Sequence, residues 1–358
     1  MGYFWAFIVT LIISVLMTGV VRNFAVKNKL TPEVRDRDSH SRPVPRIGGV
    51  AIFAAFFIVS VIYFFLINRN VVIGGGQWFG LDKRIVSIWL ASLIIVVAML
   101  WDDIRGLSAW KKFGFQSVAA LVVIAGGIGV GTLSNPFGAP IHLDSWVIAL
   151  GSHHIWVWSD LLAFFWLLGM MNVINFIDGI DGLAAGISGI AALIIFLLSL
   201  AVSQSGVAMI AIILCGAAFG FLYWNFYPAK IFMGDSGSMF LGFMLGILPL
   251  ISGGKLATAF LVLGFAIVDG LIVAGARIIR GKNPFTTPDK THLHHRFLAA
   301  GFSVPATVLS LYAIAALFGW VALRSTTMNK IIASSILVAL IGVLILVLNQ
   351  IKKRRKNV

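Results

Sequence analysis

Long apolar runs separated by short polar segments fill the chain. Residues 3–21, 47–68, 236–254 and 331–351 each contain no Asp, Glu, Lys or Arg. Each run is long enough to cross roughly 30 Å of hydrocarbon as a helix rising about 1.5 Å per residue. The pattern predicts an all-α integral membrane protein, a polytopic bundle of about eleven transmembrane helices, with ten as the alternative count. The expected spans are residues 3–22, 47–67, 84–101, 113–133, 160–177, 183–203, 206–226, 238–252, 256–276, 305–323 and 330–350.

Composition supports the same class. The 358 residues are 59% hydrophobic and 11% charged, whereas soluble domains contain about 25% charged residues. We therefore expect one transmembrane domain over residues 1–358 and no separate soluble domain. The first run lacks a basic segment before it and is too long for a signal peptide, so it is expected to be a retained anchor. The one cysteine, Cys215, predicts no disulfide.

The formal net charge of +14 is distributed unevenly. Loops after odd-numbered spans, with their flanks, hold 21 of the 27 Lys and Arg residues. The positive-inside rule places these loops and the C-terminal "KKRRK" in the cytoplasm, and the N-terminus outside, in the cytoplasmic membrane. The basic excess is thus explained by topology and by attraction to anionic lipid, about 1 kcal/mol per residue. No nucleic-acid partner is expected.

The same loops hold nine of the 13 acidic residues. One cytoplasmic site shared by several loops is the simplest interpretation. These loops lie near residues 27–46, 102–112, 172–183, 225–238 and 281–304. On the other face, His142, His153 and His154 lie in one long loop, where an ordinary exposed loop is favoured over a metal site.

Two acidic clusters suggest chemistry. Asp102 and Asp103 are adjacent and repel one another unless a cation is present; the alternative is a charged helix boundary. In "NVINFIDGIDG", Asn175, Asp178 and Asp181 recur every three residues and would share one helix face. Polar groups near membrane depth usually face a cavity or the bundle interior. Function is favoured for both clusters.

"MGDSGS" (233–238) places Asp235 between two glycines before an apolar run. Either Asp235 or Ser236 could cap the next helix. Alternatively, Asp235 could hold Mg²⁺ beside phosphates at the helix N-terminus.

"HLHHR" (292–296) gathers three imidazoles and a guanidinium. Zinc sites usually draw on more distant ligands. With Lys282 and Lys290 nearby, a phosphate-binding or proton-handling surface is favoured over zinc.

Carboxylates for Mg²⁺ and cations for phosphates, all on the inner face of a membrane bundle, favour phosphoryl transfer with a lipid substrate. The stretches "RPVPRIGG", "DDIRGLSAWKK", "NVINFIDGIDGLAAG", "NFYPAKIFMGDSGS" and "THLHHRF" follow in this order over about residues 40–300. In these motifs the chain resembles the polyprenyl-phosphate N-acetylhexosamine-1-phosphate transferases, the MraY/WecA superfamily of glycosyltransferase family 4. The resemblance implies a UDP-N-acetylhexosamine donor, a polyprenyl (undecaprenyl) phosphate acceptor, Mg²⁺ with Mn²⁺ as the alternative, and UMP release. By analogy it also implies a homodimer.

Site roles follow from the resemblance. Catalytic roles are implied for Asp102, Asp103, Lys112, Asn175, Asp178, His292, His294, His295 and Arg296. Nucleotide-binding roles are implied for Gly179, Ile180, Asp181, Asn225 and Phe232, and a metal-binding role for Asp235. Lys111 is the alternative to Lys112.

The order His-Leu-His-His-Arg-Phe resembles the WecA/TagO-like branch, which implies UDP-N-acetylglucosamine and the first membrane step of a surface glycan such as teichoic acid or O-antigen. A phospho-MurNAc-pentapeptide transferase is the alternative. Direct attack by the lipid phosphate is preferred to a route through an aspartyl-phosphate, with Asp102 as an organising group or a base. An ion-coupled transporter is the rival of another class. Asp269, deep in a span, is unassigned.

Overall fold

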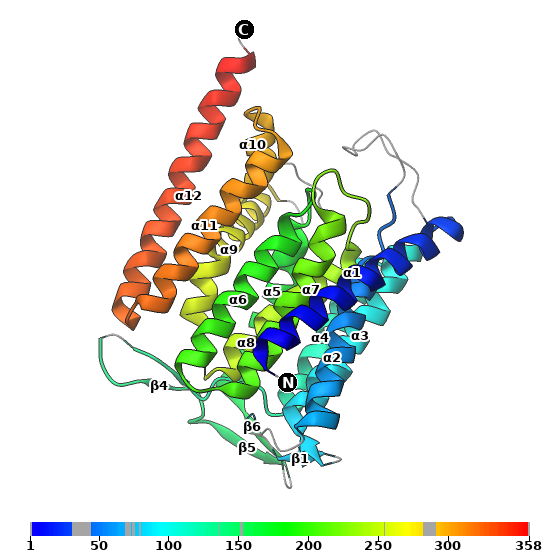
Figure 1. The fold of residues 1–358 in the computed structure, drawn as a ribbon. Helices are drawn as coiled ribbons and strands as arrows, with labels where there is room; N and C mark the ends of the chain where they lie inside the picture. The colour runs from blue at the N-terminus through cyan, green and yellow to red at the C-terminus, as the bar shows by residue number, and fades with distance from the viewer. Residues whose placement is uncertain are drawn as a thin grey trace.

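The bundle is helical throughout, with short strand pairs at one end (Figure 1). The computed structural model describes residues 2–30, 44–68, 73, 76–78, 80–135, 137–150, 153–253, 255–281 and 291–356. Its helices are α1 (Tyr3–Lys27), α2 (Gly49–Val61) continued by a π-helix (Ile62–Ile67), α3 (Lys83–Arg105), α4 (Ala109–Ala125), α5 (Val157–Ile177), α6 (Leu183–Ala201), α7 (Ser205–Asn225), α8 (Gly234–Ile251), α9 (Leu256–Ile279), α10 (Leu293–Ala299), α11 (Val304–Arg324) and α12 (Thr327–Lys356).

Three antiparallel two-stranded pairs lie in the connections that the sequence marked as the external face. They are β1–β2 (Gln77–Trp78, Leu81–Asp82), β3–β4 (Thr132–Leu133, Ile141–His142) and β5–β6 (Val147–Leu150, His153–Trp156). His142 and His154 are thus exposed residues of these hairpins.

Ten helices of the described chain are long and apolar enough to cross a membrane, which confirms the polytopic bundle. The expected span at 113–133 is instead α4, which has 17 residues and ends at Ala125, with Gly126 as its C-cap. At about 1.5 Å per residue it is about 25 Å long, slightly short of the hydrocarbon thickness. It nevertheless connects the α3 end of the bundle with the β3–β4 hairpin at the other end (Figure 1). The N- and C-termini lie toward opposite ends of the bundle (Figure 1).

Helices α7 and α8 form the centre of the bundle and are buried almost along their whole length, whereas α1 and α12 expose most of their surface. The buried side chains are apolar with interspersed small residues, which allow close helix packing in a membrane protein. Ser14 of α1, for example, donates its hydroxyl to the carbonyl of Ala217 on α7 at 2.7 Å.

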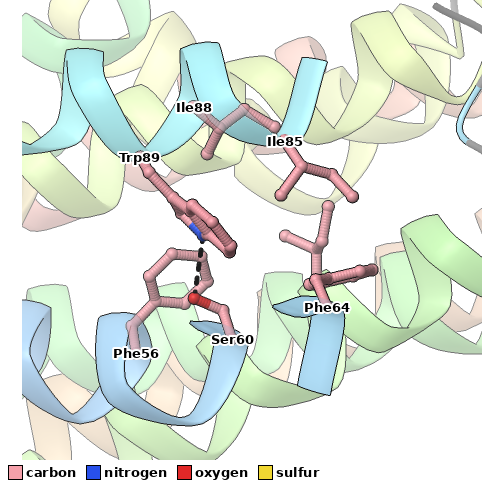
Figure 2. Close-up of a pocket in the computed structure, with 7 residues that line it drawn as sticks. Phe56, Ser60, Phe64, Ile85, Ile88 and Trp89 are labelled. Atoms are coloured by element: carbon pink, nitrogen blue, oxygen red, sulfur yellow. Dashed lines mark hydrogen bonds between the residues drawn. The ribbon is translucent and has the colours of Figure 1, made fainter. Parts of the chain in front are cut away.

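A shallow apolar crevice lies where the end of α2 meets the start of α3 (Figure 2). Phe56, Ser60, Phe64, Ile85, Ile88, Trp89 and Ile210 line it. The Trp89 indole N–H donates to the Ser60 hydroxyl at 3.0 Å, so these two polar groups are paired inside the apolar surroundings. The crevice lies toward the hairpin end and is therefore separate from the polar cluster at the other end.

Candidate active site

Four helix ends meet at the bundle end opposite the hairpins. Asp102 and Asp103 lie in the last turn of α3, Lys112 in the first turn of α4, Asn175 in the last turn of α5 and Asp235 in the first turn of α8. The sequence had assigned most of these residues to loops. They are in fact carried by helices, which hold side chains more rigidly than loops do.

Lys112 joins two of the acids. Its ammonium lies 2.6 Å from Asp102 Oδ2 and 2.7 Å from Asp235 Oδ2. The other Asp235 oxygen accepts from the Asn175 amide at 3.1 Å, and the same amide donates to Ser238 at 2.9 Å. Asp102 Oδ1 accepts the Leu107 backbone N–H at 2.6 Å. Lys112, rather than the exposed Lys111, is thus the lysine among the carboxylates.

Asp103 has a different environment from Asp102. Its carboxylate accepts the backbone N–H groups of Asp235 at 2.7 Å and Ser236 at 3.1 Å, and the Ser236 hydroxyl at 2.7 Å. These are free N–H groups at the start of α8, where a negative charge also interacts favourably with the helix dipole. The alternative in which Asp235 or Ser236 caps this helix does not hold, because the Asp103 carboxylate of α3 accepts these N–H groups instead.

Asp102, Asp103 and Asp235 each offer a carboxylate oxygen, and these atoms lie within 4.8 Å of one another. Among the described residues they form a group that could hold a metal ion. Carboxylate oxygens are the ligands of hard divalent cations such as Mg²⁺. The sequence assigned the metal to Asp235 alone, and the geometry adds the pair from α3.

Asp178 and Asp181 do not share one face. The helix ends at Ile177, and the buried Asp181 carboxylate turns to accept the Ala229 N–H at 2.9 Å. Burial, followed by the negative charges of Asp235, Asp103 and Asp181, raises the pKa of Asp178 well above its ordinary value, and Arg46 opposes this shift. Among the described residues, no hydrogen bond is made to the Asp178 carboxylate. It is therefore available to hydrogen-bond a ligand.

The turn between α5 and α6 is held from two sides. Gly182 adopts a left-handed conformation (φ 80°), its N–H donates to Asn225 Oδ1 at 3.1 Å, and its carbonyl accepts the Tyr312 hydroxyl of α11. The buried Asn225 amide also donates to the Ile231 carbonyl at 2.9 Å. Asn225 therefore fixes the turn to the segment before α8. Tyr312, in an apolar run, gave no signal in the sequence.

Two further predicted nucleotide-binding residues are half-buried: Ile180, which lies within this turn, and Phe232, which lies in the segment before α8. The Phe232 backbone N–H donates to the Pro45 carbonyl at 2.8 Å, which brings the early "RPVPRIGG" motif to the same end of the bundle. Residues 31–43 of the first predicted loop lie outside the described residues.

The histidine motif forms α10 and its N-terminal boundary. His294 is buried against Gly179, and its Nε2 has no hydrogen-bond partner in the described structure. Burial, then the neighbouring His295 and His292, lowers the pKa of His294 well below its ordinary value, so this ring is neutral. The expected cationic phosphate surface therefore does not include His294 as the structure stands. Lys282 and Lys290 lie outside the described residues.

The other members of the motif differ in their contacts. His295 is half-buried beside His294, with ring centroids 4.2 Å apart. The Arg296 guanidinium donates to the Thr291 carbonyl at 2.6 Å and to Asn349 of α12 at 3.0 Å, so it connects α10 to the last helix. His292 lies 2.8 Å from Asp269, a carboxylate that the sequence left unassigned.

Comparisons with known proteins identify a family of transferases. Residues 85–253 match the model of glycosyl transferase family 4. The chain is 32% identical, over 87% of its length and 82% of the relative, to a probable undecaprenyl-phosphate N-acetylglucosaminyl 1-phosphate transferase of Bacillus subtilis. It is 31% identical, over 84% of its length and 76% of the relative, to a decaprenyl-phosphate N-acetylglucosaminephosphotransferase of Mycolicibacterium smegmatis.

A phospho-N-acetylmuramoyl-pentapeptide-transferase of Streptococcus mutans is 29% identical, over 67% of this chain and 70% of the relative. This identity and coverage, together with the bundle of apolar helices, assign the chain to the multi-pass membrane transferases of phosphosugars. The chain belongs to glycosyl transferase family 4, among the polyprenyl-phosphate N-acetylhexosamine-1-phosphate transferases, as its ordered motifs predicted.

Proposed function

We propose that the chain transfers N-acetylglucosamine 1-phosphate from UDP-N-acetylglucosamine to a polyprenyl phosphate such as undecaprenyl phosphate, with release of UMP. The observation that carries the proposal is the cluster of Lys112 between Asp102 and Asp235, at the end of a membrane bundle. Such a cluster suits a diphosphate, which requires positive charge, and a metal, which requires carboxylates. The names of the relatives supply the sugar and the lipid class.

Asp102 and Asp235 are the proposed ligands of Mg²⁺, with Mn²⁺ as an alternative metal. Bound there, the ion neutralises negative charge on the reacting phosphates. The donor set fits this role because the two acids present carboxylate oxygens close together, the ligands that hard divalent cations prefer. Asp103 has its oxygens committed to the α8 N-terminus, so its proposed role is to position Asp235. Lys112 exchanges its carboxylate partners for a substrate phosphate.

The reaction is a direct in-line displacement. An oxygen of the lipid phosphate forms a bond to the sugar-bearing phosphorus, and the bond from that phosphorus to the bridging oxygen breaks, leaving its electron pair on UMP. A phosphate monoester is largely dianionic at neutral pH, since its second pKa is about 6. Asp102 already interacts through both oxygens with Leu107 and Lys112, which supports an organising role over that of a base.

The nucleoside is proposed to lie against Gly179, Ile180 and Asp181, with Phe232 beside it. Asp181 and Asn225 contribute through the bonds that hold this turn to residues 229–231. Neutral His294, unpartnered at Nε2 and packed on Gly179, is suited to hydrogen bonding an uncharged part of the donor substrate. His292, His295 and Arg296 complete the side of the site that faces the diphosphate and the sugar.

UMP release tests the function. Purified protein in detergent or liposomes is incubated with Mg²⁺, undecaprenyl phosphate and one of several UDP-sugars, including UDP-N-acetylglucosamine and UDP-MurNAc-pentapeptide. UMP and a lipid-diphospho-sugar are expected with UDP-N-acetylglucosamine. Release with the pentapeptide donor alone would assign the chain to the alternative branch, and no release with any UDP-N-acetylhexosamine would exclude the proposed activity.

Asp102→Asn separates the two roles considered for this residue. The amide keeps an oxygen for Leu107 but removes the charge that holds Lys112 and the metal. We expect turnover to fall about 10²-fold, by the same factor from neutral to alkaline pH, and to recover partly at high Mg²⁺. The measurement is UMP release as a function of pH and Mg²⁺. Complete loss at every pH and Mg²⁺ concentration would instead support the base role.

The site is proposed to face the cytoplasm, because the C-terminal basic residues lie at the same end of the bundle (Figure 1). Cys215 is buried, so introduced thiols can be labelled selectively. Ser108→Cys, at the site end, should react with a membrane-impermeant maleimide only in inverted vesicles. Ser145→Cys, the matched exposed position at the hairpin end, should react only in right-side-out cells. The reverse labelling would invert the orientation.

A further inference from the structure

Asp269 is a carboxylate inside a membrane-spanning helix, and it is only 2% exposed. It lies ten residues before Ile279, the last residue of α9, which is about 15 Å along the helix axis. A charged group at this position is costly unless it has partners, and such residues usually mark function. None of the roles proposed above uses it.

Both oxygens of Asp269 have partners in the histidine motif. Oδ1 accepts the Leu293 backbone N–H at 2.8 Å, and Oδ2 lies 2.8 Å from His292 Nδ1. The start of α10 therefore lies against the middle of α9. The partners are 23 and 24 residues away in sequence, which explains why the sequence gave no indication of this contact.

The contact selects one form of the imidazole. A carboxylate only accepts hydrogen bonds, so His292 Nδ1 must carry the hydrogen, and the lone pair of the neutral ring is on Nε2. The ring itself is fixed by packing. It lies parallel to the His294 ring (interplanar angle 5°, centroids 5.8 Å apart) and 5.6 Å from the Phe176 ring of α5. Phe176 lies in the last turn of α5, next in sequence to Asn175, which donates to Asp235, so this histidine packs on the helix end that also carries part of the acidic cluster.

We propose that Asp269 is a positioning residue of the transfer reaction: it fixes the tautomer and the ring orientation of His292, which then presents Nε2 to the substrates. This inference rests on the proposed function. A structural role alone would require only the bond to the Leu293 N–H, which begins α10. The second bond, to an imidazole nitrogen, also determines which ring nitrogen carries the hydrogen. Carboxylate partners of functional histidines commonly fix the tautomer in this way.

Asp269→Asn distinguishes the two roles. The carboxamide oxygen can still accept the Leu293 N–H, but its NH₂ group then faces His292 Nδ1 and can only donate. The hydrogen of the ring moves to Nε2, so the tautomer is reversed while the backbone contact is kept. We expect kcat for UMP release to fall about 10²-fold, with both KM values within about threefold of wild type. Asp269→Glu, which retains two accepting oxygens, should restore most of the lost rate.

A double-variant cycle with His292→Phe tests whether Asp269 acts through His292. Phenylalanine keeps a ring beside Phe176 and His294 but has no nitrogen. If Asp269 acts through His292, Asp269→Asn should slow His292→Phe by less than about twofold. The proposal would be overturned if the kcat reductions of the two single variants multiplied in the double variant. It would also be overturned if Asp269→Asn kept wild-type kcat. A wild-type enzyme that releases no UMP would instead refute the proposed function.

The tautomer can also be measured without relying on the stability of the Asp269 variant. In wild-type protein with ¹⁵N-labelled histidine, His292 should give a protonated Nδ1 and an unprotonated Nε2, assigned by the loss of these signals in His292→Phe. The opposite tautomer in the wild type would contradict the inference directly, whatever the behaviour of Asp269→Asn.

Discussion

Asp235→Asn is expected to reduce UMP release about 10³-fold or more at saturating substrates. Asp235 is the carboxylate on which the cluster converges, since Lys112 lies 2.7 Å from one oxygen and Asn175 3.1 Å from the other. The variant removes one metal ligand and one counter-charge of Lys112 in a single step. It leaves the α8 N-terminus intact, because the backbone N–H groups there donate to the Asp103 carboxylate. The Asp235 side chain has no part in these bonds.

The assay is UMP release over a Mg²⁺ titration, and Asp144→Asn serves as the matched control. Asp144 is an exposed carboxylate at the hairpin end, so its amide should leave turnover within about twofold of wild type. For Asp235→Asn, we also expect the Mg²⁺ dependence to shift to higher concentration. An Asp235→Asn enzyme with turnover like that of Asp144→Asn would show that the metal and the reacting phosphates lie elsewhere.

The bundle was predictable from the sequence because its signal is a series of long apolar runs without charged residues. Apolar runs without charge must be helices in a bilayer, and the structure confirms a bundle of such helices. The errors concentrate at the site. Asp235 and Lys112 were assigned to loops although each lies in a first helical turn, because polar residues in a terminal turn lower the hydropathy that marks a span.

The grouping of the acids was also predictable, since topology alone brings the loops of one face together. Which partner each of these acids contacts was not predictable. Asp102 and Asp103 are adjacent in sequence, yet Lys112 contacts one and the α8 N-terminus the other. Asp103 finds its partners 132 and 133 residues away, and Asn225 is 43 residues from Gly182. Such pairings depend on how helices pack, and no local pattern in one sequence encodes them.

The role of the "RIGG" segment illustrates the same limit and leads to the second large effect. The sequence linked this motif to the family only through resemblance. In the structure, Gly48 N–H donates to the Phe232 carbonyl at 2.9 Å and Gly49 N–H to the Met233 carbonyl at 2.8 Å. The start of α2 therefore packs directly on the segment that leads to Asp235.

Gly49→Ala is expected to reduce turnover about 10²-fold, even though Gly49 is not proposed to touch either substrate. A Cβ at Gly49 would fall far inside van der Waals contact with the backbone of Ser236 and Gly237. Backbone atoms cannot move aside as a flexible side chain can, so the α2 and α8 ends must separate. That movement displaces Asp235 from Lys112 and Asn175, and a shift of about 1 Å in a reacting group can cost about this factor in rate.

Gly169→Ala is the matched control, because Gly169 lies within α5 and a Cβ there meets no atom within 4 Å. Alanine also has a higher helix propensity than glycine, so this variant should keep wild-type turnover and thermal stability. Both variants are purified as monodisperse protein and compared by UMP release and by thermal midpoint in detergent. Gly49→Ala should lose activity and show a lower midpoint, because the contact between α2 and α8 is also structural. If its turnover matched that of Gly169→Ala, the close approach of these two helix ends would have no part in holding Asp235.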